Sequence, residues 1–343
     1  MENNTEIFRR IYAMAGDVQQ MAPWRWMYET EVFGVKIPGT DRIYFVSVMG
    51  SEGQFAAISA YRGRQGLAQF FEFQDHVENM PPETILTIPH MMLSFTDREE
   101  LDKDQLSSIR ASGLKFRGAG NWPRLEITEP AYLPVLPEGD SLTDWVVILE
   151  QTLEVTRRAA SGTDFLFREH GEYDAVLVRE QAEKSGELIW RDIYEAIDLE
   201  PMIKSFRLRV PMGMVEKVSG LPEKSMVIET DLVMLPNPVK PRGERGYLPF
   251  ALLLVEKKSG FVLGSKILAP EPDLNALHET VAGKVMDELL RLGYRPTLIE
   301  VRSRLLHGLL EQPLKEARCQ VLLVKFLPEL EEAAQSLISH LGR

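Results

Sequence analysis

The chain has 343 residues, 44% of them apolar and 26% charged, with a formal net charge of −12 at pH 7. This composition excludes a disordered chain, and the length predicts two domains, or three, with room for large cores. The negative charge disfavours general binding to nucleic acid, which is a polyanion, unless a local basic patch exists.

Signals for export or membrane insertion are missing from the sequence. Residues 1–10 lack the apolar core of a signal peptide, and no apolar run approaches the length of a membrane span. The single cysteine, Cys319, lies in an apolar, strand-like run, so no intramolecular disulfide can form and we expect a buried, unreactive thiol. We therefore expect a cytoplasmic protein from a bacterium-like cell, without membrane contact.

Residues 1–160 are predicted to form an N-terminal α+β domain with an antiparallel sheet. Apolar residues recur at helical spacing over 5–21, and the strand patterns that follow include a hairpin at 43–61. We expect this hairpin to pair with residues 29–37 and the first helix to cover one face of the sheet, because its apolar stripe has to be buried. Further predicted elements are a helix at 64–74, a strand at 83–95, a helix that starts in a capping box at Thr96 and Glu99 and ends near Gly113, and a helix at 141–159.

A segment rich in glycine and proline, FRGAGNWPRLEITEPAYLPVLPEG at 116–139, lies between the last two of these helices. It has neither the GxGxxG pattern of dinucleotide-binding loops nor the lysine of a Walker motif. We therefore expect an irregular crossing segment here and no phosphate-binding loop.

Residues 161–343 are predicted to form a second domain, with the boundary placed at SGTD, 161–164. After a first hairpin signal, strand patterns at 226–268 predict an antiparallel meander. From Pro272 on, helical periods alternate with strand patterns, so we expect residues 226–341 to form one mixed sheet flanked by helices. The later strands would join this sheet in parallel.

The element order of this region, three strands followed by alternating helices and strands, is that of the RNase H-like fold. Its sequence IETDLVMLP…YLPFALLLVEKKSGFVLG resembles the opening of an integrase or transposase catalytic core, where the first strand carries a catalytic aspartate. The resemblance implies Asp231 as that carboxylate, with Glu300 on the fourth strand and Glu331, or its neighbour Glu332, on a later helix as catalytic partners. It also implies Asp231 and Glu300 as ligands of Mg²⁺. The chain departs from the pattern at Arg302, which stands near the place of the second aspartate.

Most of the chain also resembles a set of uncharacterised bacterial proteins of unknown function. The likeness rests on WRWMYETEVFGVKIP…YFVSVMG, on MLSFTDREEL and on NWPRLEITEPAYLPVLP, followed by the C-terminal domain. It implies no activity, substrate or catalytic residue.

Two functions are compatible with these patterns. The first is a non-catalytic binding or interaction protein, without a cofactor, whose partner is an unknown protein or a small ligand. The second is a divergent metal-dependent nuclease that uses Asp231, Glu300 and Glu331 with Mg²⁺. Alternation along the first strand of the meander places Glu229 and Asp231 on one face, which we expect to be wet or ion-paired, with the core on the other face. We expect Arg302 to pair with Asp231, and this expectation favours the first function.

Overall fold

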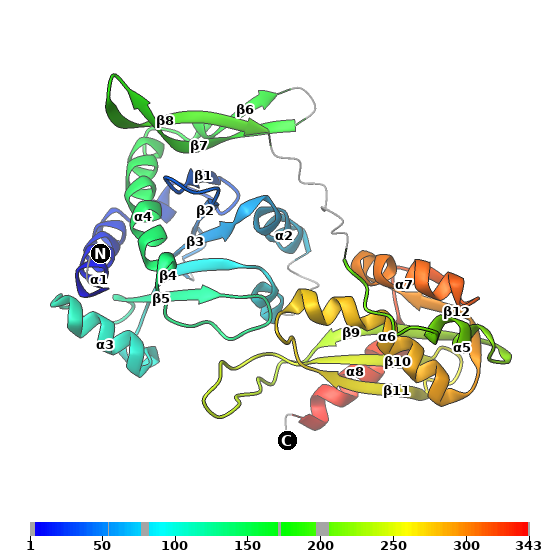
Figure 1. Ribbon diagram of the computed structural model, residues 1–343. Helices are drawn as coiled ribbons and strands as arrows, with labels where there is room; N and C mark the ends of the chain where they lie inside the picture. The colour runs from blue at the N-terminus through cyan, green and yellow to red at the C-terminus, as the bar shows by residue number, and fades with distance from the viewer. Residues whose placement is uncertain (1–3, 54, 77–81, 171–172, 197–205, 342–343) are drawn as a thin grey trace. The chain divides into compact units, whose positions relative to one another are not determined.

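The computed structural model describes residues 4–53, 55–76, 82–170, 173–196 and 206–341 (Figure 1). The chain divides into two compact units. Unit 1 comprises Met1–Glu129 and Pro134–Met202, and unit 2 comprises Pro130–Leu133 and Ile203–Arg343. Each unit has its own sheet and helices, which confirms the α+β class. Within the described residues, no helix combines the length and the apolar character needed to cross a membrane.

Unit 1 is built around a sheet that has eight strands in the described residues. These strands are β1 (Phe33–Lys36), β2 (Ile43–Met49), β3 (Ala57–Arg62), β4 (His90–Thr96), β5 (Trp122–Thr128), β6 (Phe167–His170), β7 (Tyr173–Lys184) and β8 (Glu187–Ala196). Their order is β5-β4-β3-β2-β1-β7-β6, and β8 also pairs with β7. Strands β1 and β2 pair in antiparallel fashion, so the predicted pairing of the 43–61 hairpin with residues 29–37 is confirmed.

Helices lie on both faces of this sheet. They are α1 (Asn4–Met21), α2 (Gly63–His76), α3 (Lys103–Ser112) and α4 (Asp140–Ala159). Val46 and Val48 of β2 share a core with α1, α3 and α4, whereas Phe45, the residue before Val46, packs with Leu67 and Phe70 of α2. The predicted first helix is confirmed as α1, but its apolar stripe is buried chiefly against α3 and α4, because α4 itself lies over β1 and β2 (Figure 1).

Two predicted elements of unit 1 differ from the structure. Helix α3 begins at Lys103 and not in a box at Thr96, because the side chain of Asp102 caps it by accepting the Gln105 N–H at 2.8 Å. The segment predicted to be irregular contains β5, whose Pro123 is tolerated because β5 is at the edge of the sheet.

The predicted boundary between residues 160 and 161 falls inside unit 1. Strands β6, β7 and β8 extend the N-terminal sheet, and β7 runs parallel to β1, with Gly34 opposite Val178. A Cβ atom at Gly34 would lie 2.8 Å from Cγ2 of Val178, so the missing side chain permits this close approach. The alternating pattern of β7 marks a strand but does not specify which sheet it joins.

Unit 2 contains a five-stranded sheet in the described residues. Its strands are β9 (Glu223–Met234), β10 (Phe250–Glu256), β11 (Val262–Leu268), β12 (Arg295–Val301) and β13 (Gln320–Leu323). The order is β11-β10-β9-β12-β13, in which β9, β10 and β11 are antiparallel neighbours. Strand β12 is parallel to β9, and β13 is parallel to β12. The prediction of one mixed sheet that includes the 251–268 hairpin is therefore confirmed.

Helices cover both faces of this second sheet as well. They are α5 (Met214–Ser219), α6 (Leu274–Leu292), α7 (Arg304–Glu316) and α8 (Pro328–Leu341). Helices α5, α6 and α7 share a core with Ile228 of β9, whereas α8 packs on the opposite face through Leu330. The face of β9 that carries Glu229 and Asp231 is therefore not wet, because α8 buries it.

Candidate functional site

Strands β9 and β12 bring three acidic side chains into one row on the face that α8 covers. Glu229 of β9 lies opposite Glu300 of β12 in the parallel register, and Asp231 lies two residues along β9, on the same face. We call Glu229, Asp231 and Glu300 the carboxylate row. All three are buried, with exposed fractions of 0%, 5% and 6%. The third predicted catalytic residue, Glu331, comes from α8.

Arg302, just beyond the end of β12, binds two of the predicted catalytic carboxylates. Its Nε donates a hydrogen bond to Oδ2 of Asp231 at 2.7 Å, and its Nη1 donates to Oε1 of Glu331 at 3.0 Å. The other oxygen of Asp231, Oδ1, accepts the backbone N–H of Leu232 at 2.8 Å. The predicted ion pair between Arg302 and Asp231 is confirmed, and the guanidinium also links the sheet to α8.

Lys257, which follows β10, binds Glu300, the remaining predicted catalytic carboxylate. Its Nζ lies 2.9 Å from Oε1 and 2.7 Å from Oε2 of Glu300, so one ammonium group engages both carboxylate oxygens. The hydrogen bond to Glu300 raises the pKa of Lys257 above its ordinary value. Glu300 therefore has a cationic partner of its own, which comes from the residue that follows β10.

Glu229 belongs to the same row but has no cation bound to it. Its Oε2 accepts the backbone N–H of Leu330, in the first turn of α8, at 2.8 Å, and its Oε1 has no hydrogen-bond partner within the described part of the chain. Burial raises the pKa of the Glu229 carboxyl, although the Leu330 N–H opposes the shift. Glu229 thus caps α8 from a neighbouring strand, where a carboxylate favours the positive end of the helix dipole.

The row does not fit a divalent metal site. Two-metal phosphoryl transfer requires carboxylate oxygens that are free to converge on cations. Here Arg302 and Leu232 engage Asp231, and Lys257 engages Glu300. Among the residues that the structure describes, no group of three or more His, Cys, Asp or Glu side chains is arranged to hold a metal ion. The positive charge that Mg²⁺ would bring is supplied by protein side chains.

Sequence patterns revealed part of this arrangement. Alternation along β9 placed Glu229 and Asp231 on one face, and Arg302 was expected beside Asp231. The role of Lys257 was missed, and its signal is its position at the β10–β11 turn, next to the strand that borders β9.

Cys319 is buried as predicted, and burial raises the pKa of its thiol to about 11, which disfavours the reactive thiolate.

Comparisons with known proteins agree with the division into two units. A family model described as Domain of unknown function (DUF7309) matches residues 8–179, half of the chain. Another, described as Domain of unknown function (DUF6930), matches residues 214–338, which lie within unit 2. The first match extends past residue 160 into β7, as unit 1 does. No curated protein and no solved structure matches the chain.

Proposed function

This chain belongs to the DUF7309 family of unknown function, and we propose that it is a non-catalytic binding protein. The observation that carries the proposal is the pairing of Asp231 and Glu331 with Arg302 and of Glu300 with Lys257. The partner class in this proposal is a protein or a small ligand. A cytoplasmic, bacterial setting is part of it, and the buried Cys319 and the acidic composition support that setting.

In this proposal unit 2 is an RNase H-like core that serves as a scaffold. Its antiparallel β9, β10 and β11, followed by parallel β12 and β13 that enter through α6 and α7, support the assignment. Asp231 lies on β9, the first strand of this sheet in chain order, as the resemblance implies for the first carboxylate. The order of the strands supports the proposed resemblance, whereas the chemistry of the acidic residues differs.

The charges of the row favour a structural role. A guanidinium stays protonated at every physiological pH, so Arg302 places a permanent positive charge between Asp231 and Glu331. A metal ion bound to Asp231 would have to displace the Arg302 guanidinium, and one bound to Glu300 would have to displace the Lys257 ammonium group. These contacts instead connect β9, β10 and β12 to one another and to α8, which packs on the sheet.

The test is a nuclease assay of the purified full-length protein on single- and double-stranded DNA and RNA with Mg²⁺ or Mn²⁺. We expect no cleavage by the wild type above the background of a mock purification. The matched variants are Asp231→Asn and Glu244→Gln, which remove one carboxylate inside the row and one exposed carboxylate in the loop between β9 and β10. Cleavage that disappears in Asp231→Asn but persists in Glu244→Gln would overturn the proposal and establish the nuclease alternative.

A further inference from the structure

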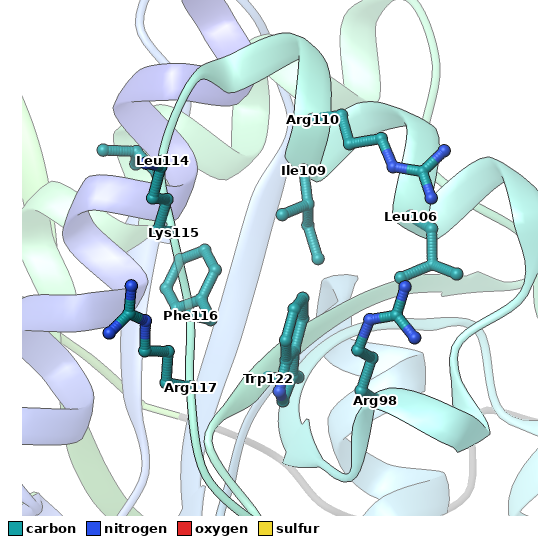
Figure 2. A pocket seen from close by; sticks show the side chains of 9 residues that line it. All are labelled: Arg98, Leu106, Ile109, Arg110, Leu114, Lys115, Phe116, Arg117 and Trp122. Atoms are coloured by element: carbon teal, nitrogen blue, oxygen red, sulfur yellow. The ribbon is translucent and has the colours of Figure 1, made fainter.

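Unit 1 contains a pocket of about 220 Å³ that is separate from the acidic residues discussed above. It opens between α3, the residues that follow α3 and the start of β5 (Figure 2). The aliphatic side chains of Leu106 and Ile109 on α3, and of Leu114 just after it, form part of the wall. The remaining lining side chains are the aromatic Phe116 and Trp122 and the cationic Arg98, Arg110, Lys115 and Arg117. No carboxylate lines the pocket.

The four cations, which we call the pocket cations, are exposed. Among the described residues, none of them forms an ion pair. Several other arginines of unit 1 are held by acids, as Arg124 is held by Glu126 at 2.6 Å. Like charges that gather without counter-charges repel one another, and a bound anion relieves that repulsion. The pocket is thus a local basic patch on a chain whose net charge is −12.

The aromatic side chains give this basic pocket two apolar ring surfaces. The rings of Phe116 and Trp122 are half-buried, and their centroids lie 6.3 Å apart at an interplanar angle of 53°. The guanidinium carbon of Arg98 lies 5.6 Å from the centroid of Trp122. Figure 2 shows Trp122 between Arg98 on one side and Phe116 and Arg117 on the other. An aromatic ring flanked by arginines accepts a planar ring by stacking and an anion by charge-assisted hydrogen bonds.

We infer that this pocket binds a phosphorylated nucleoside. Its base stacks on the Trp122 ring, next to the tilted ring of Phe116, and its phosphate accepts hydrogen bonds from pocket cations, chiefly the forked guanidinium groups of Arg98, Arg110 and Arg117. The small volume admits one base at a time, because pockets for drug-sized ligands run to roughly 300–1,000 Å³. An acidic peptide fits the pocket less well, because Asp and Glu side chains have no ring that could stack on Trp122.

A base that carries a phosphate occurs both in a free mononucleotide and in a nucleotide within a single strand. The inference gives a ligand class to the proposed binding role and rests on that role. It concerns unit 1, whereas the nuclease assay concerns unit 2, so either proposal can fail without the other.

The experiment measures binding to the full-length protein by tryptophan fluorescence and by anisotropy of labelled probes at low salt. The probes are AMP, a ten-nucleotide single-stranded DNA, adenosine and inorganic phosphate. The test variant is Arg110→Gln/Arg117→Gln, and the matched control is Arg157→Gln/Lys184→Gln, which removes two exposed cations elsewhere in unit 1. A second variant, Trp122→Phe, tests whether the fluorescence change arises from Trp122.

We expect AMP or the oligonucleotide to bind, with at least roughly tenfold weaker binding in the test variant and less than twofold change in the control. Oligonucleotide binding without AMP binding identifies the single strand as the source, and equal affinity for both identifies the free nucleotide. Three results would overturn the inference: no binding of either AMP or the oligonucleotide, unchanged binding in the test variant, or competition by inorganic phosphate or by adenosine that equals or exceeds competition by AMP.

Discussion

The cations of the carboxylate row and those of the unit 1 pocket differ in their counter-charges. Arg302 and Lys257 bind carboxylates whose side chains are only 8% exposed, so they offset charge that is withdrawn from water. The pocket cations are exposed, and none of them has an ion-pair partner in the described part of the chain. A cation that neutralises a buried carboxylate stabilises the fold, whereas a cluster without counter-charge contributes little to stability and is available to a ligand. The comparison teaches that the structural cations each contact a carboxylate, whereas the cations of the proposed binding pocket do not.

The largest expected effect is loss of stability in Arg302→Met. The substitution keeps the apolar stem but leaves Asp231 buried without its cation. Breaking a fully buried pair costs roughly 3–5 kcal/mol, and we expect about 2 kcal/mol here because the Arg302 side chain is 42% exposed. Urea unfolding of the full-length protein measures the change.

A second substitution sharpens this prediction. In Arg302→Met/Asp231→Leu the buried charge is removed together with its partner, so most of the lost stability should return. If Arg302→Met alone unfolds at the urea concentration of the wild type, the pair does not stabilise the fold and the comparison fails.

Lys257→Met should have a smaller effect of the same sign. Its partner Glu300 is buried, but the Lys257 side chain is 44% exposed, so water screens much of the interaction. We expect a loss of about 1 kcal/mol in the unfolding free energy. Lys258→Met, on the neighbouring exposed residue, is the control and should leave the urea midpoint unchanged. Equal losses in both variants would show that the effect does not come from Glu300.

The next effect is a dependence on pH that comes from Glu229. Burial raises the pKa of this carboxyl in the folded state, so the folded protein holds the proton more tightly than the unfolded chain. The stabilisation is present below the unfolded pKa and is lost as pH rises from that value through the raised folded pKa. Wild-type stability should therefore fall relative to Glu229→Gln across this window. Urea titrations from pH 4 upward measure the difference, and a constant difference would contradict the assignment.

The smallest expected change in stability is that of Arg110→Gln/Arg117→Gln. Removing two unpaired, exposed charges relieves repulsion, so the unfolding free energy should stay within about 0.5 kcal/mol of the wild type or rise slightly. A loss as large as that of Arg302→Met would show that these arginines have structural partners and would erase the contrast between the two regions.

Much of unit 2 could be predicted from the sequence because its signals are local. The change of apolar period at Pro272 separates the meander from the later helices and strands, and alternation along β9 sets Glu229 beside Asp231 on one face. The burial of that face could not be predicted in this way. It depends on α8 packing against β9 and β10, a contact between segments about a hundred residues apart, such as the bond from Leu330 to Glu229.

Less of unit 1 could be predicted because its decisive contacts are distant in sequence. The parallel pairing of β7 with β1 depends on Gly34 meeting Val178, and no local pattern encodes that choice of partner. The pocket draws its lining from residues 98 to 122, across α3 and β5. Its one sequence signal is the alternation Lys115-Phe116-Arg117, which sets an aromatic ring between two exposed cations.

The central claim is that counter-charges separate the structural cations of unit 2 from the binding cations of unit 1. Titration of AMP or the single strand, whichever binds the wild type, into Arg302→Met and Arg110→Gln/Arg117→Gln tests it most directly, with folding checked by circular dichroism. The account predicts a dissociation constant within about twofold of the wild type for Arg302→Met, and one at least roughly tenfold higher for the double variant. The reverse pattern, with binding lost in folded Arg302→Met and retained in the double variant, would contradict it.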